Sequence, residues 1–131
     1  QLEREKKIFF DLIENIPHSE ALERKGKSDI FIDQIGDRGG WGYGMNSVES
    51  LSMGICTLTQ LNSKYQKFIP DYPFINVNKA TLKENLDDLI KDRKKVSKKG
   101  EEAKIWVNEK HNIRKVSDEL YTYYRSIGLK V

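Results

Sequence analysis

The sequence has one cysteine, two histidines and no long hydrophobic run, and each shortage excludes a class of protein. Because Cys56 has no second cysteine to pair with, the chain forms no intramolecular disulfide and lacks a cysteine-rich zinc ligand set. A reducing compartment suits such a chain, so we expect a cytoplasmic protein. The longest apolar run is far short of the roughly 18 residues that cross a bilayer, and no membrane-spanning helix is predicted.

The scarcity of histidine also limits the chemistry that the chain can carry. His18 and His111 are far apart in sequence, and neither forms a nucleophile-and-base motif with Cys56 or a carboxylate. No cofactor fingerprint is present either. We therefore predict no catalytic residue, no cofactor and no metal site, and our leading hypothesis is a non-catalytic protein-interaction or regulatory module.

What the chain does contain is typical of a folded, soluble domain. Of its 131 residues, 37% are hydrophobic, 33% charged and 10% aromatic, which is too rich in Leu, Ile, Phe and Tyr for a disordered chain. We expect one domain over residues 1–131 with one core. The charged helical pattern at the first residues has no capping residue before it, so we expect this domain to come from a longer protein.

Apolar residues at steps of three and four predict helices over most of the chain. Asn46 and Asn78 are suited to cap two of the starts, while Pro17 and Gly100 are suited to mark two of the ends. The predicted helices cover residues 2–16, 19–25, 46–68 and 78–100, and a last helix of about 26 residues ends before Gly128.

Two stretches carry strand signals that compete with this helical pattern. Residues 28–35 are rich in β-branched and aromatic side chains, and a glycine-rich loop, DRGGWGYG at residues 37–44, follows them. Residues 53–60 contain Gly54 and two threonines inside a helical period. We predict a mainly α fold, a helical bundle of four to five helices with the glycine-rich loop. The alternative is α+β, with a short hairpin formed by residues 28–35 and 53–60.

The glycine-rich loop is the first candidate for a binding site. Arg38, Trp41 and Tyr43 belong to the residue types that most often anchor interfaces, so we expect this loop and a helix face to bind a protein partner. The loop could instead hold an anion, because glycines let backbone amides approach a phosphate and Asn46 opens a helix just after it. A third interpretation is that Trp41 packs into the core and the glycines only make the turn.

A basic cluster offers the second candidate. Residues 91–104 contain seven basic side chains, from Lys91 to Lys104, and only three acidic ones. Such a cluster can bind phosphates, although cations near the end of a helix are also expected for stability alone. Nucleic-acid binding is therefore our alternative function. The side chains predicted to contact the phosphates are Arg93, Lys94, Lys95, Lys98 and Lys99.

Three aspartates suggest a further alternative, a metal-dependent hydrolase. Asp29, Asp33 and Asp37 recur every four residues, and carboxylates can hold a catalytic metal. With 20 acidic residues in the chain, such a spacing also arises by coincidence. The sequence leaves the partner and the oligomeric state open.

Overall fold

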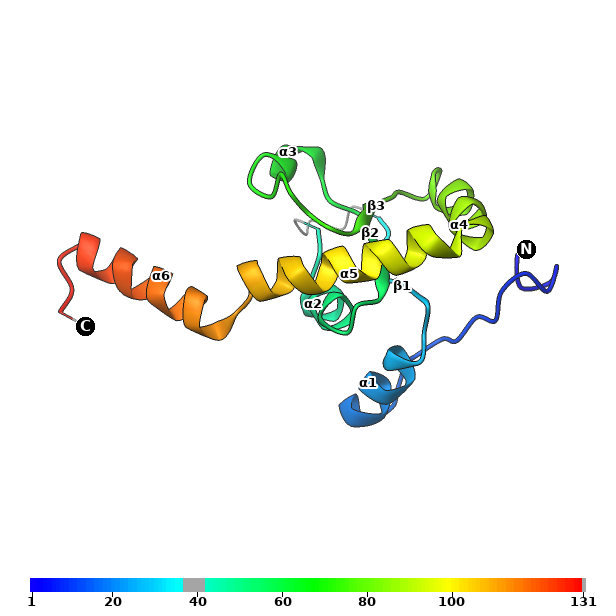
Figure 1. Cartoon of the computed structure of the whole chain (residues 1–131), viewed down its shortest axis with the longest axis horizontal. Coiled ribbons are helices and arrows are strands. Elements are labelled where there is room, and N and C mark those ends of the chain that lie inside the picture. The colour runs from blue at the N-terminus through cyan, green and yellow to red at the C-terminus, as the bar shows by residue number, and fades with distance from the viewer. Residues whose placement is uncertain (37–41, 131) are drawn as a thin grey trace.

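The computed structural model describes residues 1–36 and 42–130, and within them helices alternate with a small parallel sheet (Figure 1). About half of the chain is helical, and the fold is mixed α/β where the sequence predicted a helical bundle. In the described residues, no helix has the length and apolar character that crossing a membrane requires. The elements are α1 (His18–Gly26), β1 (Ile30–Ile32), α2 (Met45–Ser52), β2 (Cys56–Thr59), α3 (Ser63–Gln66), β3 (Ile75–Asn76), α4 (Leu82–Lys91), α5 (Arg93–Lys110) and α6 (Ile113–Ser126).

The sheet has the order β1-β2-β3, and both strand pairs are parallel. Ile30 lies opposite Cys56, and Leu58 lies opposite Ile75. The α+β alternative was therefore right to pair residues 28–35 with residues 53–60, but a hairpin is wrong because α2 crosses between them and makes the pair parallel.

The middle strand is buried on both faces, and this burial explains why the helix predicted over residues 46–68 is present only as far as Ser52, where α2 ends. All four residues of β2 are buried, so they show no alternation of apolar and polar residues. On one face Cys56 and Leu58 pack in a cluster with Leu89 of α4. On the other, the Thr57 hydroxyl lies 2.8 Å from that of Ser50 in α2.

Two glycines bring α5 into close contact with the start of β2. Gly54 has a φ of +77° and follows the end of α2, where it turns the chain into the strand. Gly100 lies inside α5, and a Cβ atom there would overlap the carbonyl oxygen of Gly54. The prediction that Gly100 ends a helix is therefore wrong. This glycine instead allows two backbones to touch.

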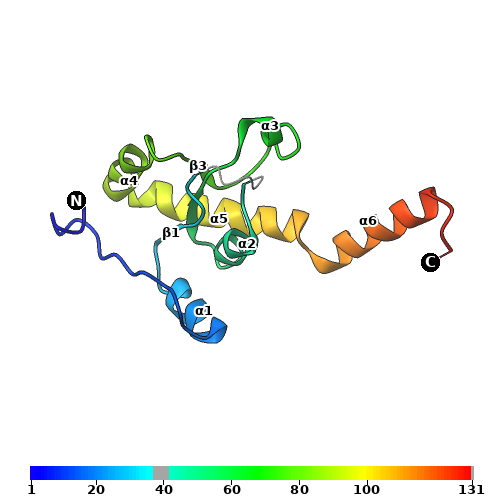
Figure 2. The ribbon, with the colours of Figure 1, turned by 180° about the vertical axis from the view of Figure 1, so that it is seen from behind.

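Each of the two helices predicted for the C-terminal part of the chain is interrupted at a residue that the sequence pattern did not mark. The predicted helix over residues 78–100 breaks at Asp92, whose side chain accepts a hydrogen bond from the amide of Lys95 at 3.0 Å and so caps α5. The predicted last helix breaks at Asn112, which caps α6 in the same way through the amide of Arg114. Seen from behind, α6 extends away from the rest of the molecule (Figure 2).

The N-terminal segment forms turns and irregular chain, so the predicted helix over residues 2–16 is wrong. Leu2 is buried, but Phe9 is 90% exposed and Leu12 is 59% exposed, so much of the apolar stripe of the predicted helix is not packed. A short amphipathic helix without tertiary packing is marginal in water. Asn15 also has a φ of +55°, which no α-helix contains. The predicted helix over residues 19–25 is confirmed as α1.

Candidate functional site

Of the three loop residues predicted to bind a partner, only Tyr43 lies within the described residues. Its ring is half-buried and packs 5.5 Å from the ring of Phe74 and 5.6 Å from that of Trp106. Its hydroxyl lies 3.4 Å from Nε2 of His111. Arg38 and Trp41 lie outside the described residues. Tyr43 thus contributes to the core, and partner binding by the three residues stays a prediction.

Burial sets the protonation of the Tyr43 and His111 pair. It raises the pKa of Tyr43 and lowers the pKa of His111. Both shifts favour the neutral form, in which the phenol can donate to the unprotonated Nε2. At neutral pH the pair therefore places no charge beside the core.

The glycine-rich loop connects β1 to α2 at the carboxyl edge of the parallel sheet. α2 begins at Met45 after Gly44, and no side-chain hydrogen bond caps its start. Just inside the helix, Ser47 donates a hydrogen bond of 2.5 Å to the Asp33 carboxylate. The described ends of this connection, residues 33–36 and 42–44, therefore lie at the edge where ligands bind in many open α/β sheets.

Amide side chains tie the loops of this edge together. The Oε1 atom of Gln60 accepts from the amide of Gly36 at 2.9 Å. The Asn76 side chain accepts from the amide of Leu61 at 2.9 Å and donates to its carbonyl at 3.2 Å. The described part of the edge is thus polar, and hydrogen bonds between residues that are distant in sequence hold it in place.

The structure does not bring the aspartates of the predicted metal site together. Asp29 and Asp33 lie at opposite ends of β1, about 13 Å apart for an extended chain. Asp29 faces Arg93 at 3.6 Å, and Asp33 is engaged by Ser47. Asp37 lies outside the described residues, among which no group of three potential ligands could hold a metal ion. The hydrolase hypothesis therefore gains no support.

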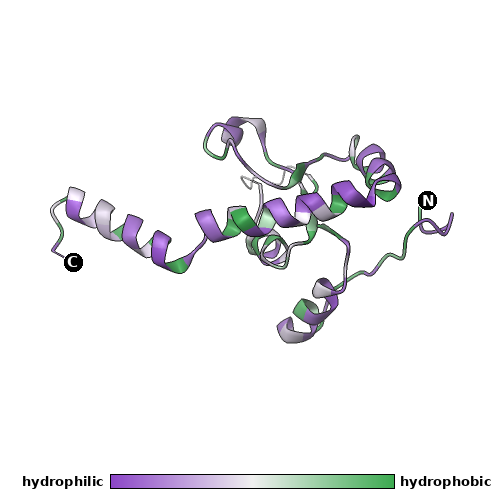
Figure 3. Ribbon diagram, viewed as in Figure 1, coloured by the Kyte–Doolittle hydropathy of each residue, from purple (hydrophilic) through white to green (hydrophobic). Residues whose placement is uncertain are grey.

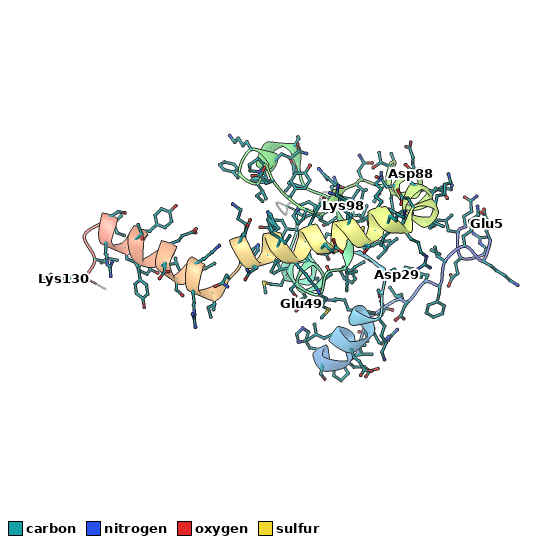
Figure 4. The ribbon with its side chains drawn as sticks, in the orientation of Figure 1. Glu5, Asp29, Glu49, Asp88, Lys98 and Lys130 are labelled. Carbon is teal, nitrogen blue, oxygen red and sulfur yellow. The ribbon has the colours of Figure 1, made fainter. Side chains whose placement is uncertain are left out.

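The basic cluster lies at the end of α4 and along the first half of α5. Lys94, Lys95 and Lys98 are exposed, and the carboxylate of Glu102 pairs with Lys99 at 2.7 Å. Figure 4 shows Lys98 on α5 among the other side chains of this helix. The cluster forms an exposed basic surface, and nucleic-acid binding through it stays a prediction.

Sequence reasoning missed a buried ion pair between α1 and α2. Lys25 is only 3% exposed, and its Nζ donates to Glu49 Oε2 at 2.5 Å and to Asn46 Oδ1 at 3.2 Å. His18 Nε2 lies 2.9 Å from the other oxygen of Glu49. The bond from Lys25 is the largest cause that lowers the pKa of Glu49. Lys25 lies in the charged run ERKGK, and nothing in that run distinguishes it from an exposed lysine.

Sequence reasoning also missed how little covers the apolar face of α6. Among the described elements, the end of α5 is the main contact of this helix. In Figure 3 hydrophilic and hydrophobic residues alternate along it, as on an amphipathic helix. Its apolar side chains are exposed, and they are Ile113, Val116, Leu120, Tyr121, Tyr123, Tyr124 and Ile127. The spacing was visible in the sequence, but the absence of a covering element was not.

Comparisons with protein-family models, with curated proteins and with solved structures found no match.

Proposed function

We propose that this domain is a protein-interaction module that docks the apolar face of α6 into a groove on its partner. The observation that supports the proposal is the exposure of that face, with Ile113 at 80% and Ile127 at 72%. Folded proteins rarely leave a contiguous apolar surface open unless it binds something.

The spacing of the side chains fits the recognition of a helix by a groove. Ile113, Val116 and Leu120 are separated by three and four residues, and Tyr123 and Ile127 continue the same stripe. Each such side chain is worth about 1.5–3 kcal/mol when a partner removes it from water. Tyrosines beside the stripe add large contact areas, and tyrosine is enriched at binding hot spots.

Docking would also stabilise the helix itself. A helix of 14 residues is marginal in water without packing, and Asn112 contributes only its cap. On binding, the partner would provide the tertiary contacts that the rest of this chain does not.

The test compares two variants of α6 in capture experiments with the tagged domain. Leu120→Asp places a charge in the apolar stripe and is expected to abolish capture of the partner. Thr122→Asp adds the same charge on the opposite face of the helix and is expected to leave capture unchanged. Equal capture by the wild type and Leu120→Asp would reject the proposal.

A second candidate function, binding of a phosphate-bearing small molecule, is favoured by the connection between β1 and α2. At the carboxyl edge of the sheet, the end of β1 and the start of α2 lie on either side of this connection, and no side chain of the described residues caps that helix start. Helix N-termini attract anions through free backbone amides and the helix dipole. Met45 is 73% exposed at this start, so a ligand can reach it.

Calorimetric titration with a nucleoside diphosphate tests this candidate. Met45→Asp puts a carboxylate where the phosphate would bind and should weaken binding at least tenfold, while the helix start tolerates the acidic residue. Met45→Leu is the matched control and should bind as the wild type does. Absence of heat with the wild-type domain would reject this candidate.

A further inference from the structure

The sheet has an open edge at β1. This strand pairs with β2 on one side, and in the described residues no strand lies on its other side. Because the amide of Asp33 donates to the carbonyl of Leu58, the alternation of the ladder directs the backbone groups of Ile30 and Ile32 to the open side. Parallel sheets are normally larger, with about five or six strands, and an open edge is a site for pairing with another strand.

The same chain carries an apolar segment that has no strand partner. Residues 8–13 read IFFDLI, a composition typical of a buried strand. In the structure, however, Phe9 is 90% exposed and Leu12 is 59% exposed. The segment thus has the sequence of a strand without the burial that a strand of this composition requires.

The order of the elements along the chain is the one that a further parallel strand at residues 8–13 would have. It is followed by α1 and then by β1, with 16 residues between residue 13 and Ile30. A parallel pair needs a crossover of a dozen or more residues, usually through a helix, and α1 provides that helix. The order of segment, helix and strand is therefore that of a βαβ unit.

The segment does not pair with β1 of its own chain because α1 holds it elsewhere. The Arg24 guanidinium on α1 donates to both carboxylate oxygens of Asp11 and, at 3.3 Å, to the carbonyl of Leu12. Figures 1 and 2 show the segment running from α1 toward the end of the molecule where α4 lies. In the described residues, an open sheet edge and a strand-like segment thus exist in one molecule without pairing with each other.

We infer that residues 8–13 of a second copy pair in parallel with the open edge of β1. Each copy carries both the edge and the strand, so two copies can fill both edges reciprocally and close the assembly by two-fold symmetry. Backbone hydrogen bonds to Ile30 and Ile32 would give affinity, and burial of the apolar side chains of the incoming strand would add to it. This inference is independent of the α6 face.

Light scattering of the full chain over a range of concentrations provides the first test. The wild type is expected to form a dimer, and Phe9→Asp is expected to stay monomeric at the same concentrations. Because Phe9 is 90% exposed, its replacement costs the monomer little stability. Phe68→Asp, at a residue that is 66% exposed on another part of the surface, is the matched control and should dimerise as the wild type does.

Hydrogen exchange locates the contact. Dimerisation should slow exchange of the Ile30 and Ile32 amides at least tenfold, and a peptide of residues 6–14 added to Phe9→Asp should restore that protection. A wild-type monomer whose Ile30 and Ile32 amides the peptide does not protect would overturn the inference. So would a dimer that Leu120→Asp dissociates and Phe9→Asp does not, because that result would assign self-association to α6.

Discussion

The sheet with its covering helices and the C-terminal helix are stabilised in different ways. In the first region Leu51 and Leu58 are fully buried. Gly54, just before β2, and Gly100 in α5 let their two backbones touch. In the second region Leu120 is 46% exposed, and every other residue of α6 except Ser117 is exposed as well. Leucine side chains therefore stabilise the core in the first region, whereas in the second region a leucine lies exposed on the surface.

The largest expected effect contrasts two leucines. Leu51→Ala should lower the free energy of unfolding by about 3–5 kcal/mol, because it removes a buried side chain and leaves a cavity. Leu120→Ala should change it by less than about 0.5 kcal/mol, since the side chain makes few contacts in the isolated domain. Urea denaturation of both variants measures the contrast. Similar losses would mean that α6 packs on the body in solution.

The close contact between Gly54 and Gly100 gives the next effect. Gly100→Ala should destabilise the domain by about 3 kcal/mol, although alanine is the better helix former, because its methyl group overlaps the carbonyl oxygen of Gly54. Gly26→Ala is the matched control, since its methyl group would meet only the sulfur of Met53 at 3.9 Å. Thermal melts of the two variants should differ clearly. Equal melting temperatures would show that α5 can shift away from β2.

The ion pair that attaches α1 to α2 should show a dependence on pH. Glu49→Gln should cost about 2 kcal/mol at pH 7, because it leaves Lys25 buried without its carboxylate. Since Lys25 lowers the folded pKa of Glu49 from 4.5, this stability is complete above that value and is lost as the pH falls through the folded pKa. Denaturation of both proteins from pH 7 to pH 3 should show their difference shrinking below about pH 4.5. A constant difference would contradict the linkage.

The smallest effect should be confined to α6. Asn112→Ala removes the cap whose oxygen accepts from the amide of Arg114, at a cost of about 1 kcal/mol to the helix. Amide exchange should accelerate in residues 113–126 and stay unchanged in β2 and α5. Glu109→Ala, at an exposed residue near the end of α5, is the control. Faster exchange throughout the chain would show that the two regions unfold together.

The sequence predicted local features better than their arrangement. Strand propensity correctly marked residues 28–35 and 53–60, and the short helix after Ser19 is present. Periodicity misled over residues 46–68, because a strand buried on both faces repeats its apolar residues without alternation. The sequence predicts a helix end at Gly100, because the close approach that this glycine permits depends on Gly54, 46 positions earlier, and no local pattern carries that information.

The candidate sites show the same difference between what local composition predicts and what depends on the tertiary arrangement. The basic cluster was visible as composition and is exposed on α5, whereas Asp29 and Asp33 lie apart because β1 is extended between them. The ion pair of Lys25 joins residues 24 positions apart in sequence, and the open edge of β1 is a property of the sheet as a whole. Such features arise from the tertiary arrangement and cannot be read from the order of residues.

The contact between Gly54 and Gly100 also has an evolutionary consequence. Neither position can acquire a side chain alone, because a methyl group at Gly100 meets a carbonyl and any side chain at Gly54 meets both a left-handed backbone and Lys104. A single substitution at either site should therefore be removed by selection in any descendant that keeps this fold. Among homologues, glycine at both positions would then identify this fold even where the rest of the sequence has diverged.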